Sequence, residues 1–145
     1  MARPRHPIVL TLILGCLASG LTACTQVGEY KSTYSSTSVK PVKGRVDAQQ
    51  VTFTALAAQR AGLRTATVRA SGRETSIPYA ALIYDATGRT YTYVSSKPLV
   101  YLREPIDIDR IAGDKVLLRH GPLLGTTVVT TGAAEVYSAE FGVEQ

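Results

Sequence analysis

The chain has 145 residues, of which 45% are hydrophobic and 19% are charged, enough for one globular domain and no more. Its formal net charge is +5; leaving out Arg3 and Arg5 of the N-terminal segment gives 14 basic against 11 acidic residues, a net charge of +3. The remaining basic residues are scattered along the sequence, whereas a nucleic-acid footprint needs a basic stripe or patch, ideally with stacking aromatic residues beside it. We therefore do not expect nucleic acid as a partner.

The first 23 residues have the pattern of a signal peptide. Arg3 and Arg5 supply a positive n-region, residues 8–17 form an apolar run, and small residues follow before Cys24. The apolar run is shorter than the roughly 20 residues that a membrane-spanning helix needs. We expect residues 1–23 to be removed from the mature protein.

The residues Leu21-Thr22-Ala23-Cys24 resemble the lipobox of bacterial lipoproteins. The resemblance implies that the Cys24 thiol is diacylated and that Cys24 becomes the first mature residue. Two alternatives stay open, namely cleavage before Cys16 and an ordinary secretory signal with an incidental cysteine. Because several acyl chains hold a protein at a bilayer far better than one, we expect a lipid-anchored envelope protein, on the outer face of the cytoplasmic membrane or in the periplasm.

Residues 24–46 are rich in Ser, Thr and Lys, contain Pro41 and Gly44, and lack sustained apolar periodicity. Such a segment buries too little apolar area to offset the entropy of ordering it. The composition predicts a lipid-anchored flexible tether over residues 24–46, followed by a β-rich domain over residues 47–145. The alternative is that residues 38–46 add an edge strand to that domain.

Within the domain, alternating apolar and polar residues predict strands, and Gly, Pro and Asp predict the turns between them. The clearest signal is Asp85-Ala86-Thr87-Gly88, because Asp suits the first position of a type I turn and Gly the left-handed position after it. Pro105 must lie at an edge or a bulge, since it has no N–H to donate to a ladder. The expected elements are strands at 51–54, 63–68, 77–84, 89–95, 99–111, 115–119 and 126–131, a polar turn at 69–76, a turn at 112–114, a Gly-Pro loop at 121–125, a short helix from Thr54 to about Ala61 with Gly62 at its end, and a final helical turn at 133–139.

Several short strands at regular spacing indicate a small all-β domain. The expected fold class is mainly β, a small antiparallel β-barrel or sandwich with one or two short helices, after a signal peptide and a flexible tether. The chain has no internal repeat and no coiled-coil heptad.

The stretch from Ile77 onward resembles the membrane-proximal domain of periplasmic adaptor subunits (membrane fusion proteins) of efflux transporters, and residues 51–68 resemble a segment near the start of that family's conserved region. The residues that carry the resemblance are Ile77-Pro78-Tyr79-Ala80-Ala81-Leu82, Tyr84-Asp85 with Gly88, Thr90-Tyr91-Thr92-Tyr93-Val94, Gly113-Asp114-Lys115-Val116, Gly121-Pro122 with Gly125, and Val128-Val129-Thr130-Thr131-Gly132-Ala133-Ala134-Glu135. The ordered series covers about two thirds of the chain. It implies a reduced adaptor whose partner is an inner-membrane transporter or a full-length adaptor.

This chain departs from the family in an important way. The lipoyl half-motifs, the long helical hairpin and the β-barrel domain of a full adaptor are not recognisable in it, and residues 69–76 bridge the two conserved segments directly. The part of an adaptor that engages an outer-membrane channel is missing. We therefore do not expect this chain alone to transport a substrate across two membranes.

The sequence carries no pattern of a catalytic or metal site. His120 is the one histidine of the mature chain and is expected in a solvent-facing turn, since a metal site of the usual type needs three or four ligands. Asp107 and Asp109 share a strand face and are expected to be solvated rather than catalytic. We expect no enzyme activity and no cofactor.

Four tyrosines are the candidate contact residues. Tyr79, Tyr91, Tyr93 and Tyr101 would suit a strip for protein contact, because Tyr offers contact area at low entropy cost. The alternative is that some of them fill the core. The sequence favours a non-enzymatic adaptor or accessory lipoprotein, with a ligand-binding or sensing lipoprotein and a cell-wall-associated structural lipoprotein as alternatives.

Overall fold

A computed structural model describes residues 36–142 of the chain. The expected signal peptide and the candidate lipidation site at Cys24 lie outside these residues. The elements, in chain order, are β1 (Thr37–Val42), β2 (Arg45–Phe53), α1 (Ala55–Arg60), β3 (Arg64–Thr67), β4 (Arg69–Ser71), β5 (Glu74–Pro78), the 3₁₀ turn η1 (Tyr79–Ala81), β6 (Ile83–Tyr84), β7 (Thr90–Lys97), β8 (Val100–Pro105), β9 (Asp107–Ala112), β10 (Lys115–His120), β11 (Thr127–Thr131) and α2 (Ala133–Phe141).

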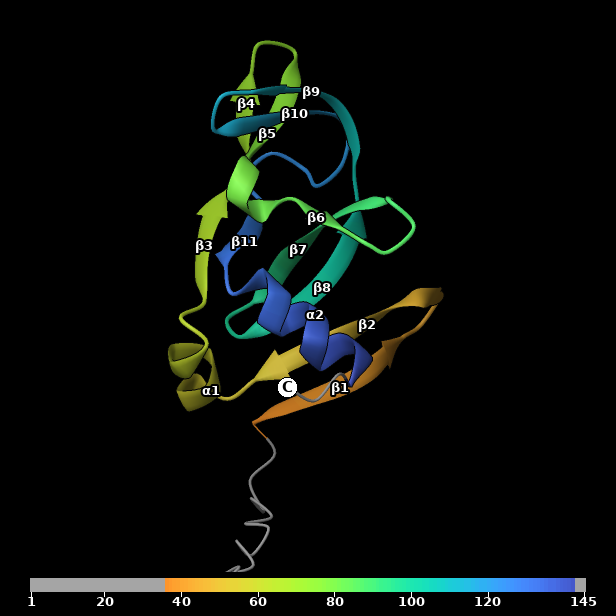
Figure 1. The fold of residues 1–145 in the computed structure, drawn as a ribbon, viewed down its shortest axis with the longest axis vertical. Helices are drawn as coiled ribbons and strands as arrows, with labels where there is room; N and C mark the ends of the chain where they lie inside the picture. The colour runs from red at the N-terminus through yellow and green to blue at the C-terminus, as the bar shows by residue number, and fades with distance from the viewer. Residues whose placement is uncertain (1–35, 143–145) are drawn as a thin grey trace, which may run out of the picture. The chain divides into compact units, whose positions relative to one another are not determined.

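The strands form two antiparallel sheets (Figure 1). The larger has seven strands, in the order β1-β2-β8-β7-β11-β3 with β6 paired to β7, and the smaller has four, in the order β4-β5-β10-β9. The fold is mainly β, antiparallel and sandwich-like, with two short helices, so the expected fold class is confirmed, in its sandwich form. Neither helix has the length and apolarity that crossing a bilayer would require in the part of the chain that the structure describes.

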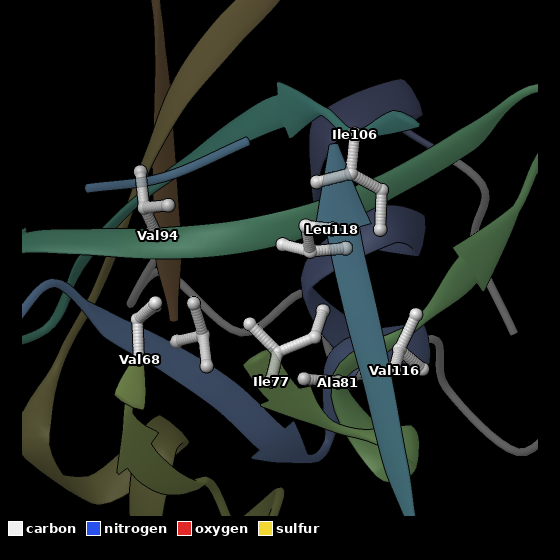
Figure 2. Close-up of a cluster of buried hydrophobic side chains, with 8 residues drawn as sticks. Val68, Ile77, Ala81, Val94, Ile106, Val116 and Leu118 are labelled. Carbon is white, nitrogen blue, oxygen red and sulfur yellow. The ribbon is translucent and has the colours of Figure 1, made fainter. Parts of the chain in front are cut away.

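Two apolar cores lie on opposite faces of the larger sheet. One is shared with the smaller sheet and includes Ile77, Ile106 and Leu118 (Figure 2). The other is shared with both helices and includes Phe53, Ala58 and Val136. Because both faces are covered, consecutive residues of a central strand are both buried, one in each core. On β7, Tyr93 lies in the second core and Val94 in the first; on β11, Val128 lies in the first core and Val129 in the second.

The local signals for the helix and the hairpin are confirmed. The Thr54 hydroxyl accepts a hydrogen bond from the Ala57 amide at 3.2 Å, which caps α1, and Gly62 adopts the left-handed conformation just after it. β6 and β7 pair across the turn at residues 85–88. The two strands and the final helix expected after Asp114 also form, as β10, β11 and α2, with the expected Gly-Pro loop between the strands.

The expected boundary between tether and domain is wrong. Strand β1 begins at Thr37 and pairs with β2 from Thr37 opposite Phe53 to Val42 opposite Arg45, so the alternative of an edge strand is the one that the structure has. The prediction failed because it counted buried apolar side chains. An edge strand stays largely exposed and is held by backbone hydrogen bonds to a single neighbour.

Three expected strand and turn assignments in the middle of the chain also need correction. The strand expected at 77–84 is divided, because β5 ends at Pro78 in the smaller sheet and β6 belongs to the larger one. The expected turn at 69–76 is a hairpin of β4 and β5, closed at Gly72, which has a φ of +65°. The strand expected at 99–111 likewise divides after Pro105, which ends β8.

Candidate functional site

A cleft of about 730 Å³ opens where β2 diverges from β8. β2 pairs with β8 only through Gln50, Val51 and Thr52. The part of β2 before Gln50 is therefore not paired with β8. The turn between β1 and β2, the turn between β6 and β7, and the C-terminal end of α2 supply the walls.

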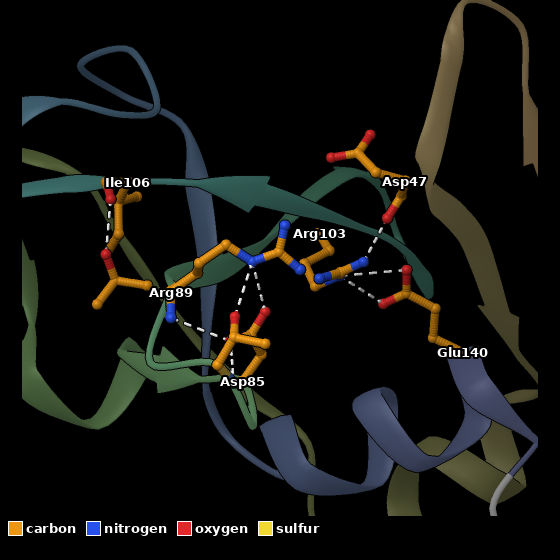
Figure 3. A network of polar contacts seen from close by, with 8 residues as sticks. Asp47, Asp85, Arg89, Arg103, Ile106 and Glu140 are labelled. Carbon is orange, nitrogen blue, oxygen red and sulfur yellow. Dashed lines mark hydrogen bonds and ion pairs between the residues drawn. The ribbon is translucent and has the colours of Figure 1, made fainter.

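The floor of the cleft is a buried ion pair between Arg103 of β8 and Glu140 of α2 (Figure 3). Arg103 Nε lies 3.1 Å from Glu140 Oε2, and the two side chains are only 6% and 1% exposed. The Tyr93 hydroxyl donates to Glu140 Oε2 at 2.5 Å, and the Gln49 amide donates to Glu140 Oε1 at 3.2 Å. Burial, and then the hydrogen bond to Glu140, raise the pKa of Tyr93 far above its ordinary value, so this hydroxyl stays protonated.

Arg103 is held on every side. Its guanidinium lies 4.5 Å from the centre of the Tyr91 ring and 5.1 Å from that of Phe141, both within cation–π range. It also donates to the backbone carbonyl of Asp47, while Arg45 Nη2 donates to the Arg103 carbonyl at 2.9 Å. The guanidinium is therefore positioned by the fold, with hydrogen bonds at Nε and Nη2 and two aromatic rings against it.

A second ion pair stands at the wall of the cleft, in the turn between β6 and β7. Asp85 Oδ1 accepts from the Thr87 hydroxyl at 2.7 Å and from the amides of Thr87 and Arg89 at 2.9 and 3.0 Å. Asp85 Oδ2 accepts from Arg89 Nε at 2.8 Å. The hydrogen bond from the Thr87 hydroxyl is the largest cause that holds the pKa of Asp85 well below its ordinary value.

The four candidate tyrosines do not form a strip on the surface. Tyr91, Tyr93 and Tyr101 are 4%, 0% and 4% exposed, and only Tyr79, in η1, is half-exposed. Tyr101 packs edge-on against Phe53 with ring centres 5.9 Å apart. The physical reason is the covering of both faces of the larger sheet, which leaves no solvent-facing side for aromatic residues on β7.

Sequence reasoning missed Arg103 and Glu140. A usable signal existed, because Arg103 lies two residues from the buried Tyr101 on one strand and Glu140 lies four residues from the buried Val136 on one helix. A charged residue on the buried, apolar face of a strand or helix needs a partner of opposite charge that is buried with it.

The acidic residues and the histidine singled out in the sequence lie elsewhere, on the smaller sheet. Asp107 and Asp109 form ion pairs of 3.4 and 3.2 Å with Arg119 in solvent, and the side chain of His120 is 86% exposed. Within residues 36–142, no three His, Cys, Asp or Glu side chains gather as metal ligands do.

The fold and the cleft together define a small two-sheet antiparallel β domain with a cleft floored by a buried Arg–Glu pair. Compared with models of protein families, with curated proteins and with solved structures, the chain matches none of them.

Proposed function

We propose that this chain is a non-enzymatic envelope lipoprotein, anchored through Cys24, that serves as an adaptor or accessory subunit of a membrane efflux system. Its partner is an inner-membrane transporter or a full-length adaptor, bound at the cleft by protein–protein docking. The proposal begins from the resemblance of the ordered residue series between Ile77 and Glu135 to the membrane-proximal domain of adaptors.

One observation of the cleft carries the proposal furthest. Four of its charged side chains neutralise each other in two pairs, Arg103 with Glu140 and Asp85 with Arg89, while Val46 and Phe141 at the same cleft stay exposed. Of the other two charged residues that line it, Arg45 donates to the Arg103 carbonyl and the exposed Asp47 forms no ion pair among residues 36–142. A reactive centre needs a nucleophile, acid or base available to a substrate. Satisfied polar groups beside exposed apolar side chains instead suit a protein interface.

The test is co-purification of the tagged full chain with its transporter, after crosslinking and extraction in mild detergent. Val46→Asp places a charge on a fully exposed side chain at the cleft. It should lower recovery of the transporter roughly tenfold, because the complex loses the free energy of burying one apolar side chain at the interface. Ile111→Asp, an exposed residue of β9 outside the cleft lining, is the matched control and should leave recovery unchanged.

Recovery of the unmodified lipoprotein alone under crosslinking would contradict docking. Anchoring is tested separately by mass spectrometry, which should find Cys24 acylated at the N-terminus of the mature chain. An unmodified cysteine there would remove the anchoring part of the proposal and leave docking to be judged by the first experiment.

The volume of the cleft favours a second candidate, a ligand-binding lipoprotein, because about 730 Å³ lies within the range of small-molecule pockets. Such pockets present a few polar groups that converge on the ligand. Here those of the floor already bond one another, so a ligand that binds Arg103 or Glu140 has to compete with an existing ion pair. Saturable binding of a small molecule to the full chain, lost in Val46→Asp, would support this candidate over docking.

A further inference from the structure

The longest part of the domain without an acidic residue carries four arginines. No Asp or Glu occurs between Ala48 and Arg73, and all four arginines of this stretch are exposed; they are Arg60, Arg64, Arg69 and Arg73, here called the arginine edge. None of them takes part in an ion pair among residues 36–142. The expectation that basic residues are scattered therefore holds along the sequence and not over the folded surface.

The fold gathers the arginine edge on one side of the domain. α1, β3 and β4 follow one another along that side (Figure 1). β3 is the last strand of the larger sheet and β4 is the last strand of the smaller one. The chain from Arg64 to Ser71 thus forms the border of both sheets, with only Val68 buried between them.

An exposed pair of leucines is fixed to the middle of this border. The Gly125 amide donates to the Val68 carbonyl at 3.1 Å, and the Val68 amide donates to the Thr126 carbonyl at 2.8 Å. The turn held by these two bonds carries Leu123 and Leu124, which are 80% and 62% exposed. Two largely exposed apolar side chains therefore lie on a turn that is bonded to the middle of the arginine edge.

We propose that the arginine edge, together with Leu123 and Leu124, binds the anionic headgroups of a lipid membrane. A guanidinium matches the oxygens of a phosphate with two parallel hydrogen bonds, and leucine side chains partition into the headgroup and acyl boundary. α1, β3 and β4 contain no aromatic residue, so the stacking platform of a single-stranded nucleic-acid site is missing from this side. The inference rests on the proposed function in one respect, since a lipid anchor is what would hold the domain close to a bilayer.

The test uses the full chain with Cys24→Ser, so that neither acylation nor a transporter contributes to binding. The chain is sedimented with vesicles of phosphatidylcholine, or of phosphatidylcholine and phosphatidylglycerol in equal amounts. We expect tighter binding to the anionic vesicles, weakened when salt is raised from about 0.1 M to about 1 M. Residues 1–23 are present in every variant, so a difference between variants reports on the substituted arginines.

The matched pair of variants is Arg64→Gln/Arg69→Gln on the arginine edge and Arg110→Gln/Arg119→Gln in the ion-paired cluster of the smaller sheet. Each arginine near an anionic surface contributes about fivefold, so the first variant should bind anionic vesicles roughly 25-fold more weakly and the second should lose far less. Equal binding to both vesicle types, or equal loss in both variants, would overturn the proposal. Neither outcome bears on whether a transporter docks at the cleft.

A second measurement follows the leucines directly. The chain has no Trp, so Leu124→Trp introduces a single fluorescent reporter, and Ile111→Trp on β9 is its control. The emission of the first should shift to shorter wavelength with anionic vesicles only, and that of the second should not shift. A reporter at position 124 that stays in water while the chain sediments with vesicles would exclude the leucines from the site.

Discussion

At the scale of single residues, Asp85 organises the turn between β6 and β7. Its carboxylate accepts from two amides, a hydroxyl and a guanidinium within four residues of sequence, which explains why Asp at this position predicted the hairpin so well. These donors bind the charged form of the carboxylate. The pKa of Asp85 in the folded protein therefore lies well below its ordinary value of 3.8.

The depressed pKa has a defined consequence for stability. Above pH 3.8 the ionised carboxylate stabilises the folded state, and this contribution is lost as the pH falls from there toward the folded pKa. We expect the melting temperature of the unmodified chain to fall more steeply below that pH than the melting temperature of Asp85→Asn. Thermal unfolding followed by circular dichroism across this range measures the two slopes.

The control for Asp85 is Asp114→Asn in the turn between β9 and β10. Asp114 takes part in no ion pair among residues 36–142, and its backbone carbonyl, not its carboxylate, accepts from the Tyr79 amide. Asp114→Asn should keep the acid slope of the unmodified chain. If Asp85→Asn kept that slope as well, the turn network would not contribute to acid stability.

At the scale of elements, Gly132 joins β11 to α2 where the end of α1 and the start of β3 come close. Its φ of +78° is in the left-handed region, and a Cβ built on it would lie 2.2 Å from Leu63 Cδ2 and 3.0 Å from the Ala61 carbonyl. Gly125 has a similar φ of +85° but nothing within 4 Å of a Cβ. The two glycines therefore separate the cost of the backbone conformation from the cost of the contact.

Gly125→Ala should lower the free energy of unfolding by about 1 to 2 kcal/mol, the usual cost of a left-handed residue with a side chain. Gly132→Ala should lose about 1 to 3 kcal/mol more, because the methyl group overpacks the Leu63 side chain and the Ala61 carbonyl. Urea denaturation of both variants measures the difference. Equal losses would mean that α2 shifts away from α1 at little cost.

At the scale of the whole molecule, the Arg103–Glu140 pair joins segments that lie far apart in the chain. Glu140 bonds Tyr93, Arg103 and Gln49, at sequence separations of 47, 37 and 91 residues. It thereby ties α2 to β7, β8 and β2 at once. Removing one member of such a buried pair leaves a charge without compensation.

We expect Glu140→Ala to lower the free energy of unfolding by about 3 to 5 kcal/mol, measured by urea denaturation. The double variant Arg103→Met/Glu140→Leu removes both charges and keeps most of the side-chain volume. It should be clearly more stable than the single variant, because no unpaired charge stays buried. A double variant less stable than Glu140→Ala would show that the hydrogen bonds of the pair outweigh its desolvation cost.

The sequence by itself determined what depends on near neighbours. The helix after Thr54, the turn at Asp85 and the β class follow from capping, turn chemistry and alternation, each of which acts within a few residues. Tyr91 and Tyr93 were also noticed in the sequence, as candidate surface contacts with core filling as the alternative, and their burial favours the alternative.

Only the tertiary structure decided the environment of each side chain. β1 forms because β2 offers a free edge, the tyrosines are buried because helices and a second sheet cover both faces of the central strands, and Arg103 meets Glu140 across 37 residues. The arginine edge exists because α1, β3 and β4 lie along the same side of the domain. The sequence held only partial signals for these relations, namely the spacing of Arg103 and Glu140 from buried apolar residues and the run from Ala48 to Arg73 without an acidic residue. The relations themselves depend on which distant segment lies beside the residue.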